Sequence, residues 1–252
     1  MPRTEHVLIT CEHGGNRIPP CYRLLFAGFE TLLHSHRGYD PGALAVARKF
    51  ARLLDAPLFV STTSRLLIDL NRSIGHPKLY SEATRNAPAA VRREILARHY
   101  LPYRTAVEAH IAAAIARGSR VIHLASHSFT PVLDGVVRNA DVGLLYDPAR
   151  AGEAELCRRW QLRIESRARG LRLRRNYPYT GKSDGFTAFL RRRFSADLYV
   201  GIELEINQKH VLPGGRRWLA LQALVVETFH SATMECQGAG MPAPHEIRSP
   251  LK

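Results

Sequence analysis

The 252-residue sequence predicts an α/β fold. Short apolar runs, typical of buried strands, alternate along the chain with longer segments whose apolar residues recur at helical spacing. Apolar residues make up 45% of the chain and charged residues 23%, the balance of an ordinary globular protein. A chain of this length buries roughly three quarters of the surface that it exposes when unfolded, so it can form a sizeable core without disulfides.

A strand, a helix and a second strand are expected first. Residues 6–11 (HVLITC) are an apolar run typical of a buried strand, and the polar, glycine-rich stretch 12–16 ends it. Residues 41–54 have apolar side chains at helical spacing, with Asp40 as the predicted N-cap and a proline at the first helical position. Residues 57–62 (PLFVST) are expected to form the second strand.

The next stretch is expected to contain an extended segment, a loop and a long helix. Residues 66–70 are read as extended, and residues 74–88 are rich in Pro, Gly, Ser and Asn, which predicts a surface loop. Residues 89–116 are helical by pattern, with a kink expected at Pro102 and with Gly118 ending the helix.

The second half of the chain again alternates strands and helices. Strands are expected at residues 120–126, 142–146 and 198–206, and helices at residues 153–169 and 216–234. We expect residues 1–235 to form a single catalytic domain. Glycines and prolines dominate residues 236–252, so this tail is expected to be flexible.

The formal net charge of +14 favours a negatively charged partner. The arginines are spread along helical segments, apart from denser runs at residues 172–175 and 191–193, and no nucleic-acid-binding motif accompanies them. We therefore expect a small anionic substrate rather than a nucleic acid. The sequence shows no signal peptide and no apolar run long enough to span a bilayer, which predicts a cytoplasmic protein without a membrane partner. The oligomeric state stays open.

Polar side chains occur at the ends of three predicted strands. His13 follows the first strand and precedes two glycines, His127 follows the third, and Glu205 lies near the end of the last. In open α/β sheets, ligands bind at the carboxyl ends of the strands. Two histidines and a carboxylate, with a fourth position for water, are typical of a catalytic zinc site.

The last strand places two carboxylates in an apolar context. Glu203 and Glu205 are two residues apart, so their side chains share one face of the sheet. A buried carboxylate is costly unless it is paired or bound to a metal. We interpret Glu205 as the general base that takes a proton from the hydrolytic water. A salt bridge to an arginine is the alternative.

Residues 64–72 (SRLLIDLNR) are the other informative segment. Arg72 offers a planar fork that suits a carboxylate, and Asn71 adds a donor beside it. Asp69 is expected either to orient an arginine or to ligate the metal. An ordinary strand end with a salt bridge is the simpler alternative.

Together these motifs make the chain resemble the N-formylglutamate amidohydrolase family, and more widely the zinc carboxypeptidases and the aspartoacylase/succinylglutamate desuccinylase group. The resemblance covers residues 7–211, and its motifs are ITCEHGGNRIP (9–19), YDPGALAVAR (39–48), SRLLIDLNRS (64–73), ASHSFTPV (125–132), VGLLYD (142–147), NYPYTG (176–181) and IELEINQ (202–208). It implies a zinc-carboxypeptidase-like (phosphorylase/hydrolase-like) fold with three layers, in which helices cover both faces of a mixed, mostly parallel central sheet.

The resemblance also implies roles for single residues. His13 and His127 match the histidine ligands of one zinc ion, Asn71 and Arg72 the clamp for the substrate carboxylate, and Glu205 the general base. The wider group has a glutamate three residues after its first histidine ligand. This chain has Asn16 there, a poor ligand. Asp40 is expected to replace that glutamate, with Glu12 as the alternative, and the identity of the metal stays open with the third ligand.

The activity that the resemblance implies is cleavage of N-formyl-L-glutamate to formate and glutamate by a metal-dependent amidohydrolase of histidine catabolism. Arg65 and Arg138 are expected to assist in binding the substrate and its oxyanion, and the segment around Asn176, Tyr177 and Tyr179 to close over the site. Two alternatives stay open. One is a zinc peptidase or a polyglutamate or cell-wall peptide hydrolase on the same scaffold, and the other is a non-enzymatic anion- or nucleic-acid-binding protein.

Overall fold

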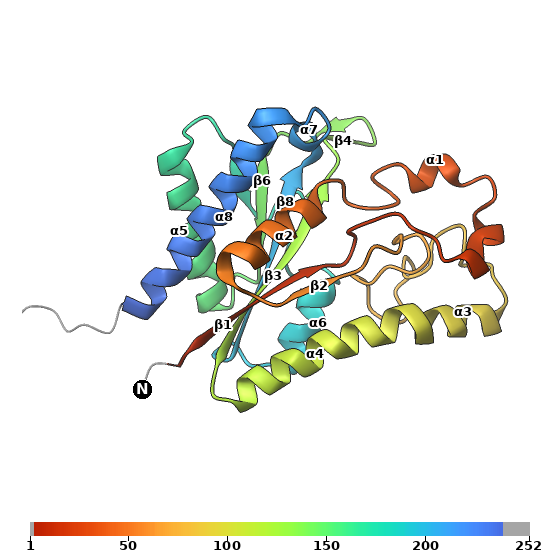
Figure 1. Ribbon diagram of the computed structural model, residues 1–252, viewed down its shortest axis with the longest axis horizontal. Coiled ribbons are helices and arrows are strands. Elements are labelled where there is room, and N and C mark those ends of the chain that lie inside the picture. Colours follow the sequence, from red (N-terminus) through yellow and green to blue (C-terminus); the bar gives the residue numbers. More distant parts are fainter. Residues whose placement is uncertain (1–2, 239–252) are drawn as a thin grey trace, which may run out of the picture.

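The computed structural model describes residues 3–238, which form a central sheet of six strands with helices on both faces (Figure 1). The strands are β1 (Glu5–Cys11), β2 (Leu58–Val60), β3 (Arg120–Phe129), β6 (Val142–Leu145), β7 (Leu173–Arg175) and β8 (Tyr199–Asn207). They are hydrogen-bonded in the order β2-β1-β3-β8-β6-β7. The first four in this order run parallel, β6 runs antiparallel to β8, and β7 is parallel to β6. The predicted mixed, mostly parallel sheet is confirmed.

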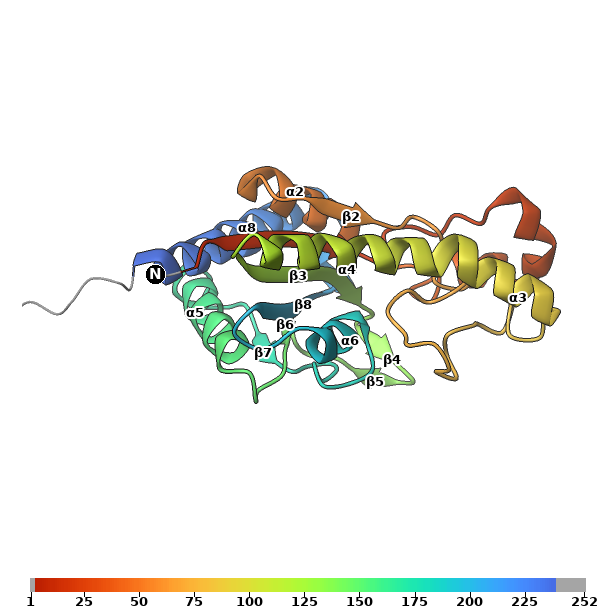
Figure 2. The same cartoon turned by 90° about the horizontal axis from the view of Figure 1, so that it is seen from below.

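Two apolar clusters bury the two faces of the sheet. On one face, side chains of β1, β3 and β8 pack with α2 (Ala43–Leu54), α5 (Ala151–Arg167) and α8 (Gly215–Gly238). On the other face, a smaller cluster joins the sheet to α4 (Leu101–Ala116) and α6 (Phe186–Arg193). Figure 2 shows α2 and α8 on the opposite side of the sheet from α6, with α4 in front. The three predicted layers are therefore present.

A third apolar cluster lies beyond the carboxyl end of β1, in the region that carries α1 and α3 in Figure 1. It joins η1 (Pro20–Phe26), α1 (Glu30–Leu33), the segment 66–80, α3 (Ala89–Ile95) and the π-helical η2 (Leu96–Tyr100). The hairpin of β4 (Val132–Leu133) and β5 (Val136–Val137) follows β3, and the short helix α7 (Gln208–Val211) follows β8. These segments surround the edge of the sheet where the parallel strands end.

Several boundaries differ from the sequence predictions near this edge. Gly42, with a φ of 84°, is the N-cap residue of α2, so the prediction of Asp40 as N-cap was wrong. Residues 66–70 form turns rather than an extended segment, because their apolar side chains pack into the third cluster instead of joining the sheet. Strand β3 continues to Phe129, so His127 lies inside the strand and not after it.

The helices also differ in detail. The predicted helix at 89–116 is interrupted by the π-helical η2, and Pro102 lies in the first turn of α4, directly after it. Strand β7 and helix α6 were not predicted, and both are short. Helix α8 extends to Gly238, past the predicted domain end at residue 235, and the remaining tail 239–252 lies outside the described residues.

Candidate active site

The turn after β1 is held close to a neighbouring segment. Gly14 donates its backbone N–H to the carbonyl of Ser61 at 2.9 Å, and a Cβ on Gly15 would lie 2.8 Å from the carbonyl oxygen of Thr62. Glycine is therefore required for this close backbone approach. The backbone N–H of Asp40 donates to the carbonyl of His13 at 3.0 Å, which brings the start of the α2 segment against the end of β1.

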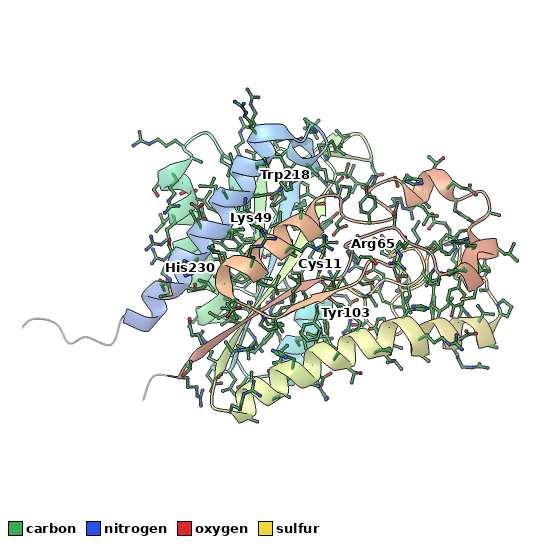
Figure 3. All side chains as sticks on the ribbon, in the orientation of Figure 1. Cys11, Lys49, Arg65, Tyr103, Trp218 and His230 are labelled. Carbon is green, nitrogen blue, oxygen red and sulfur yellow. The ribbon has the colours of Figure 1, made fainter. Side chains whose placement is uncertain are left out.

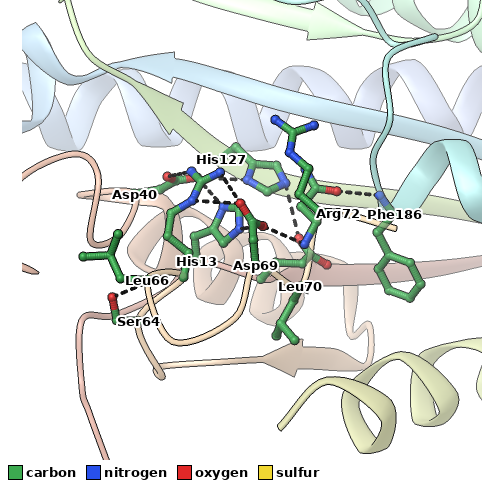
Figure 4. A network of polar contacts seen from close by, with 12 residues as sticks. His13, Asp40, Ser64, Leu66, Asp69, Leu70, Arg72, His127 and Phe186 are labelled. Atoms are coloured by element: carbon green, nitrogen blue, oxygen red, sulfur yellow. Dashed lines mark hydrogen bonds and ion pairs between the residues drawn. The ribbon is translucent and has the colours of Figure 1, made fainter. Parts of the chain in front are cut away.

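His13, Asp40 and His127 converge in the interior of the protein (Figure 4). Each offers one possible ligand atom, and these atoms all lie within 4.8 Å of one another. The Nδ1 atoms of His13 and His127 lie 3.2 Å and 2.9 Å from the same atom, Asp40 Oδ2, and the two ring centroids are 5.2 Å apart. The three residues that the sequence suggested as metal ligands are thus brought together by the fold.

The opposite nitrogen of each imidazole faces a second carboxylate. His13 Nε2 lies 2.8 Å from Asp69 Oδ1, and His127 Nε2 lies 3.2 Å from Glu12 Oε2. Carboxylates in this position fix the orientation of imidazoles that ligate metals. Glu12 therefore lies behind His127, outside the group of convergent ligand atoms. The side-chain amide of Asn16 donates to the carbonyl of Leu33.

Arg65 donates hydrogen bonds to two of the carboxylates around the histidines. Its Nη2 donates to Asp69 Oδ2 at 2.7 Å and its Nη1 to Asp40 Oδ1 at 3.3 Å. Although burial by itself raises a carboxyl pKa, the charge of Arg65 and the adjacent imidazoles hold the pKa of Asp69 and of Asp40 below the ordinary range. The pKa of His127 is raised despite burial, because the adjacent carboxylates of Asp40 and Glu12 favour its charged form. The site therefore packs carboxylates, imidazoles and one guanidinium group against one another.

Glu205 is the unpaired carboxylate of the site. It forms a cross-strand pair with His127, so the two side chains share one face of the sheet. Its Oε2 is buried and, within residues 3–238, has no hydrogen-bond partner. Burial raises its pKa to about 8, an effect that the charge of His127 opposes and the charges of Asp40 and Glu203 strengthen. The described residues place no arginine in an ion pair with Glu205, which disfavours the salt-bridge alternative.

Glu203 lies on the same face as Glu205 but serves a different contact. Its Oε1 accepts a short hydrogen bond from the hydroxyl of Thr187 in α6. Glu203 also lines the cavity of the site. Glu205 thus lies beside His127, whereas Glu203 is held towards α6.

The segment with Asn71 and Arg72 forms one wall of the site. Asn71 Oδ1 accepts from the backbone N–H of Phe186, which leaves the side-chain amide as a donor. Arg72 donates through Nη1 to the carbonyl of Asp184, whereas its buried Nε has no partner among the described residues. Both residues line the cavity. The Asp184 carboxylate is held by the hydroxyl and backbone N–H of Ser73, so residues far apart in sequence fix the position of Arg72.

The cavity has a volume of about 950 Å³, and His13, Asp40, Arg65, Asn71, Arg72, His127, Glu203 and Glu205 are among its lining residues. Arg138 is not among them. It is buried and donates to the hydroxyl of Tyr179 at 3.0 Å, with its guanidinium over the Tyr179 ring. Tyr179 itself lines the cavity, so Arg138 reaches the site through this tyrosine.

Two features of the site escaped the sequence analysis. Asp184 and Tyr103 carry no periodic or motif signal, and their partners Arg72 and Glu12 are distant in sequence. The Tyr103 hydroxyl donates to Glu12 Oε1 at 3.0 Å from helix α4, and Figure 3 shows Tyr103 where that helix passes below Cys11, the last residue of β1. Only the packing of α4 against the sheet reveals this contact.

Comparisons with known proteins show the fold and the family of the chain. The product of gene Atu2144 from Agrobacterium tumefaciens, a solved structure, is 30% identical, with a TM-score of 0.78 over 92% of this chain and 91% of that one. The N-formylglutamate amidohydrolase from Ralstonia eutropha JMP134 is 19% identical, with a TM-score of 0.68 over 94% of this chain and 96% of that one, a likeness of fold. A comparison with proteins of curated function finds no significant match. The family model for N-formylglutamate amidohydrolase matches residues 5–212, within two residues of the predicted limits of the resemblance, and the chain therefore belongs to the N-formylglutamate amidohydrolase family.

Proposed function

We propose that the protein is a metal-dependent amidohydrolase that cleaves the amide bond of an N-acyl amino acid, with N-formyl-L-glutamate as its substrate and formate and glutamate as its products. The family supplies the reaction class. The observation that carries the metal dependence is the convergence of ligand atoms from His13, Asp40 and His127 within 4.8 Å, next to the unpartnered carboxylate oxygen of Glu205.

The donor set fits a zinc ion. Two imidazole nitrogens and one carboxylate oxygen are ligands that catalytic zinc takes, with a fourth position left to water. The carboxylates of Asp69 and Glu12 at the opposite ring nitrogens match the support that metal-ligating histidines receive. A zinc ion bound there would lower the pKa of the hydrolytic water and would polarise the amide carbonyl. Other divalent ions fit the same donors, so the choice of zinc is part of the proposal.

The remaining chemistry belongs to the side chains. Glu205 accepts the proton of the attacking water and delivers it to the leaving nitrogen, a role that its buried, unpaired Oε2 suits. Arg72 and the amide of Asn71 hold the substrate carboxylate from the opposite wall of the cavity. Arg65 donates to the developing oxyanion from its position beside Asp40, and Arg138 holds Tyr179 at the cavity. We further propose that residues 176–179 close over the bound substrate.

The size of the cavity favours one alternative substrate class. A volume of about 950 Å³ is at the upper end for a drug-sized ligand, well beyond the space that a single formylated amino acid fills. A peptide or γ-glutamyl oligomer on the same catalytic residues is therefore the second candidate. A non-enzymatic anion- or nucleic-acid-binding role is the third, and it predicts salt-sensitive retention on DNA without bound metal.

One experiment tests the proposal. Purified protein is analysed for metal content and then assayed, loaded with zinc, against formyl-, acetyl- and succinyl-glutamate and against short γ-glutamyl peptides. Release of formate from N-formyl-L-glutamate, lost on chelation and restored by zinc, is the expected result. Cleavage of the peptides alone would favour the second candidate, and no cleavage by metal-loaded protein would refute the proposal.

Among the helices of residues 3–238, none combines the length and the apolar character that a membrane span requires. The cytoplasmic location stays a prediction.

A further inference from the structure

A buried line of side chains runs from helix α4 to the back of His127. The Tyr103 hydroxyl donates to Glu12 Oε1 at 3.0 Å, and the other oxygen, Glu12 Oε2, lies 3.2 Å from His127 Nε2. Glu12 is 1% exposed and His127 3% exposed. Neither Glu12 nor Tyr103 lines the cavity, so this line approaches the histidine from the side away from the substrate.

The contact between Glu12 and His127 is close but incomplete. Oε2 and Nε2 are at ion-pair distance, yet both are buried atoms without a hydrogen bond of good geometry. Leaving two complementary buried groups unsatisfied at this distance is costly, so a hydrogen bond between them is the expected arrangement of the pair. The same ring carries Nδ1 on its other side, 2.9 Å from Asp40 Oδ2. The orientation of the His127 ring in which Nε2 donates to Glu12 therefore also sets the direction of Nδ1.

We propose that Glu12 is a positioning residue for His127, and that Tyr103 acts through it. Glu12 accepts a hydrogen bond from the Nε2–H of the imidazole. This hydrogen bond selects the tautomer whose Nδ1 lone pair faces Asp40 and His13. The hydrogen bond from Tyr103 holds the Glu12 carboxylate in the orientation that this requires. The inference rests on the metal centre of the proposed function, and it assigns Glu12 to support rather than to ligation.

The two histidines are supported in different ways. The carboxylate behind His13, Asp69, also accepts hydrogen bonds from Arg65, which lines the cavity. The carboxylate behind His127 is instead tied to Tyr103 in the helical layer. A substrate that draws on Arg65 therefore acts on the carboxylate behind His13. The hydrogen bond between Tyr103 and Glu12 behind His127 does not involve Arg65.

The test is the zinc affinity of Glu12→Gln and Tyr103→Phe, measured by competition with a chromophoric chelator. Glu12→Gln is expected to bind zinc roughly 10- to 100-fold more weakly, the usual effect of removing such a support. Tyr103→Phe is expected to weaken binding roughly fivefold, less than Glu12→Gln, because it removes one hydrogen bond to the Glu12 carboxylate and leaves the carboxylate itself in place. If Tyr103 acts through Glu12, Tyr103→Phe has no further effect in the Glu12→Gln background.

Tyr22→Phe is the matched control, because Tyr22 is a buried tyrosine that also donates to a glutamate, Glu94, but in the third apolar cluster. Its zinc affinity should equal that of the wild type. The absorption spectrum of the cobalt-substituted protein should change in Glu12→Gln and not in Tyr22→Phe. Thermal unfolding of each variant separates weaker metal binding from loss of the fold.

Wild-type affinity in Glu12→Gln would overturn the inference, and so would an equal effect of Tyr103→Phe in both backgrounds. The measurement does not use hydrolysis. A protein whose zinc affinity depends on Glu12 but which cleaves none of the substrates therefore refutes the proposed function and leaves this inference standing. A wild-type protein that does not bind zinc refutes both.

Discussion

His127 and Glu205 are paired positions on the neighbouring parallel strands β3 and β8. The pairing puts a proposed metal ligand and the proposed general base side by side on one face of the sheet. A shift of the register by one residue would turn Glu205 to the opposite face, because side chains alternate along a strand. The pairing of two central strands therefore determines the distance between metal and base.

Glu205→Gln should abolish turnover and leave the metal bound. The amide is nearly isosteric with the carboxylate but cannot accept the proton of the attacking water, so kcat should fall by about 10²–10⁴-fold. The zinc content should stay at the wild-type level, since Glu205 is not among the convergent ligand atoms. Steady-state kinetics and metal analysis of the same preparation check both parts. Full activity in the variant would exclude Glu205 as the base.

His13→Ala should lose the metal itself. One of the three convergent donors disappears, and Asp40 and His127 alone make a poor zinc site. Inductively coupled plasma mass spectrometry of protein dialysed against zinc should find little bound metal. His110→Ala is the control, because His110 contacts His6 near the start of β1, away from the site. Stoichiometric zinc in His13→Ala would contradict the ligand assignment.

Arg72→Ala should weaken substrate binding. A charge-assisted hydrogen bond to a carboxylate is worth about 1.5–3 kcal/mol, which corresponds to an increase in KM of roughly 10- to 100-fold. Arg72→Lys should recover only part of this, since an ammonium group lacks the planar fork of a guanidinium. Zinc content should not change in either variant. An unaltered KM in Arg72→Ala would place the substrate carboxylate elsewhere, and thermal unfolding would show whether the lost contact to Asp184 matters for stability.

The stability of chelator-treated protein should fall with rising pH because of Glu205. Burial raises the pKa of its carboxyl group from an ordinary 4.5 to about 8. Below about pH 4.5 both folded and unfolded states hold the proton, and as the pH rises towards 8 only the unfolded state ionises freely. Glu205→Gln has no such penalty. Measured by urea unfolding, the free energy of unfolding of Glu205→Gln should exceed that of the wild type by an amount that increases with pH and reaches at least about 1 kcal/mol between these pH values. Curves that stay parallel over this range would contradict the raised pKa.

Arg191→Ala should destabilise the fold strongly. Arg191 is 8% exposed, and its Nε donates to Glu153 while its Nη1 and Nη2 donate to the carbonyls of Gly181 and Gly201. Removing the guanidinium leaves the buried Glu153 carboxylate without its counter-charge, with only the backbone N–H groups of Asp147 and Gly201 donating to it among residues 3–238, at an expected cost of about 3–5 kcal/mol. Chemical denaturation measures this loss. Arg192→Ala removes an exposed neighbour on the same helix and should change stability by less than about 0.5 kcal/mol.

Local sequence patterns predicted the elements with strong periodicity. The buried strands at 6–11 and 198–206 and the helices at 41–54, 153–169 and 216–234 were placed to within a few residues, because an apolar run or a helical stripe leaves few alternatives. The patterns misread Leu66–Leu70, whose apolar side chains fill a cluster outside the sheet. They also missed α6, where the buried Arg191 stands in a run of arginines that is typical of a solvated face.

By itself, the sequence determined the family, the α/β class and the candidate residues His13, His127 and Glu205, because each of these follows from motifs and from neighbours along the chain. Only the tertiary structure decided which carboxylate joins the two histidines. The sequence favoured Asp40 but left Glu12 and Asp69 open. The crossing of β1, α2 and the segment after β2 puts Asp40 between the rings and the other two behind them. The physical reason is that ligation depends on the distance between atoms that the folded backbone brings together from remote positions, and local sequence carries no measure of that distance.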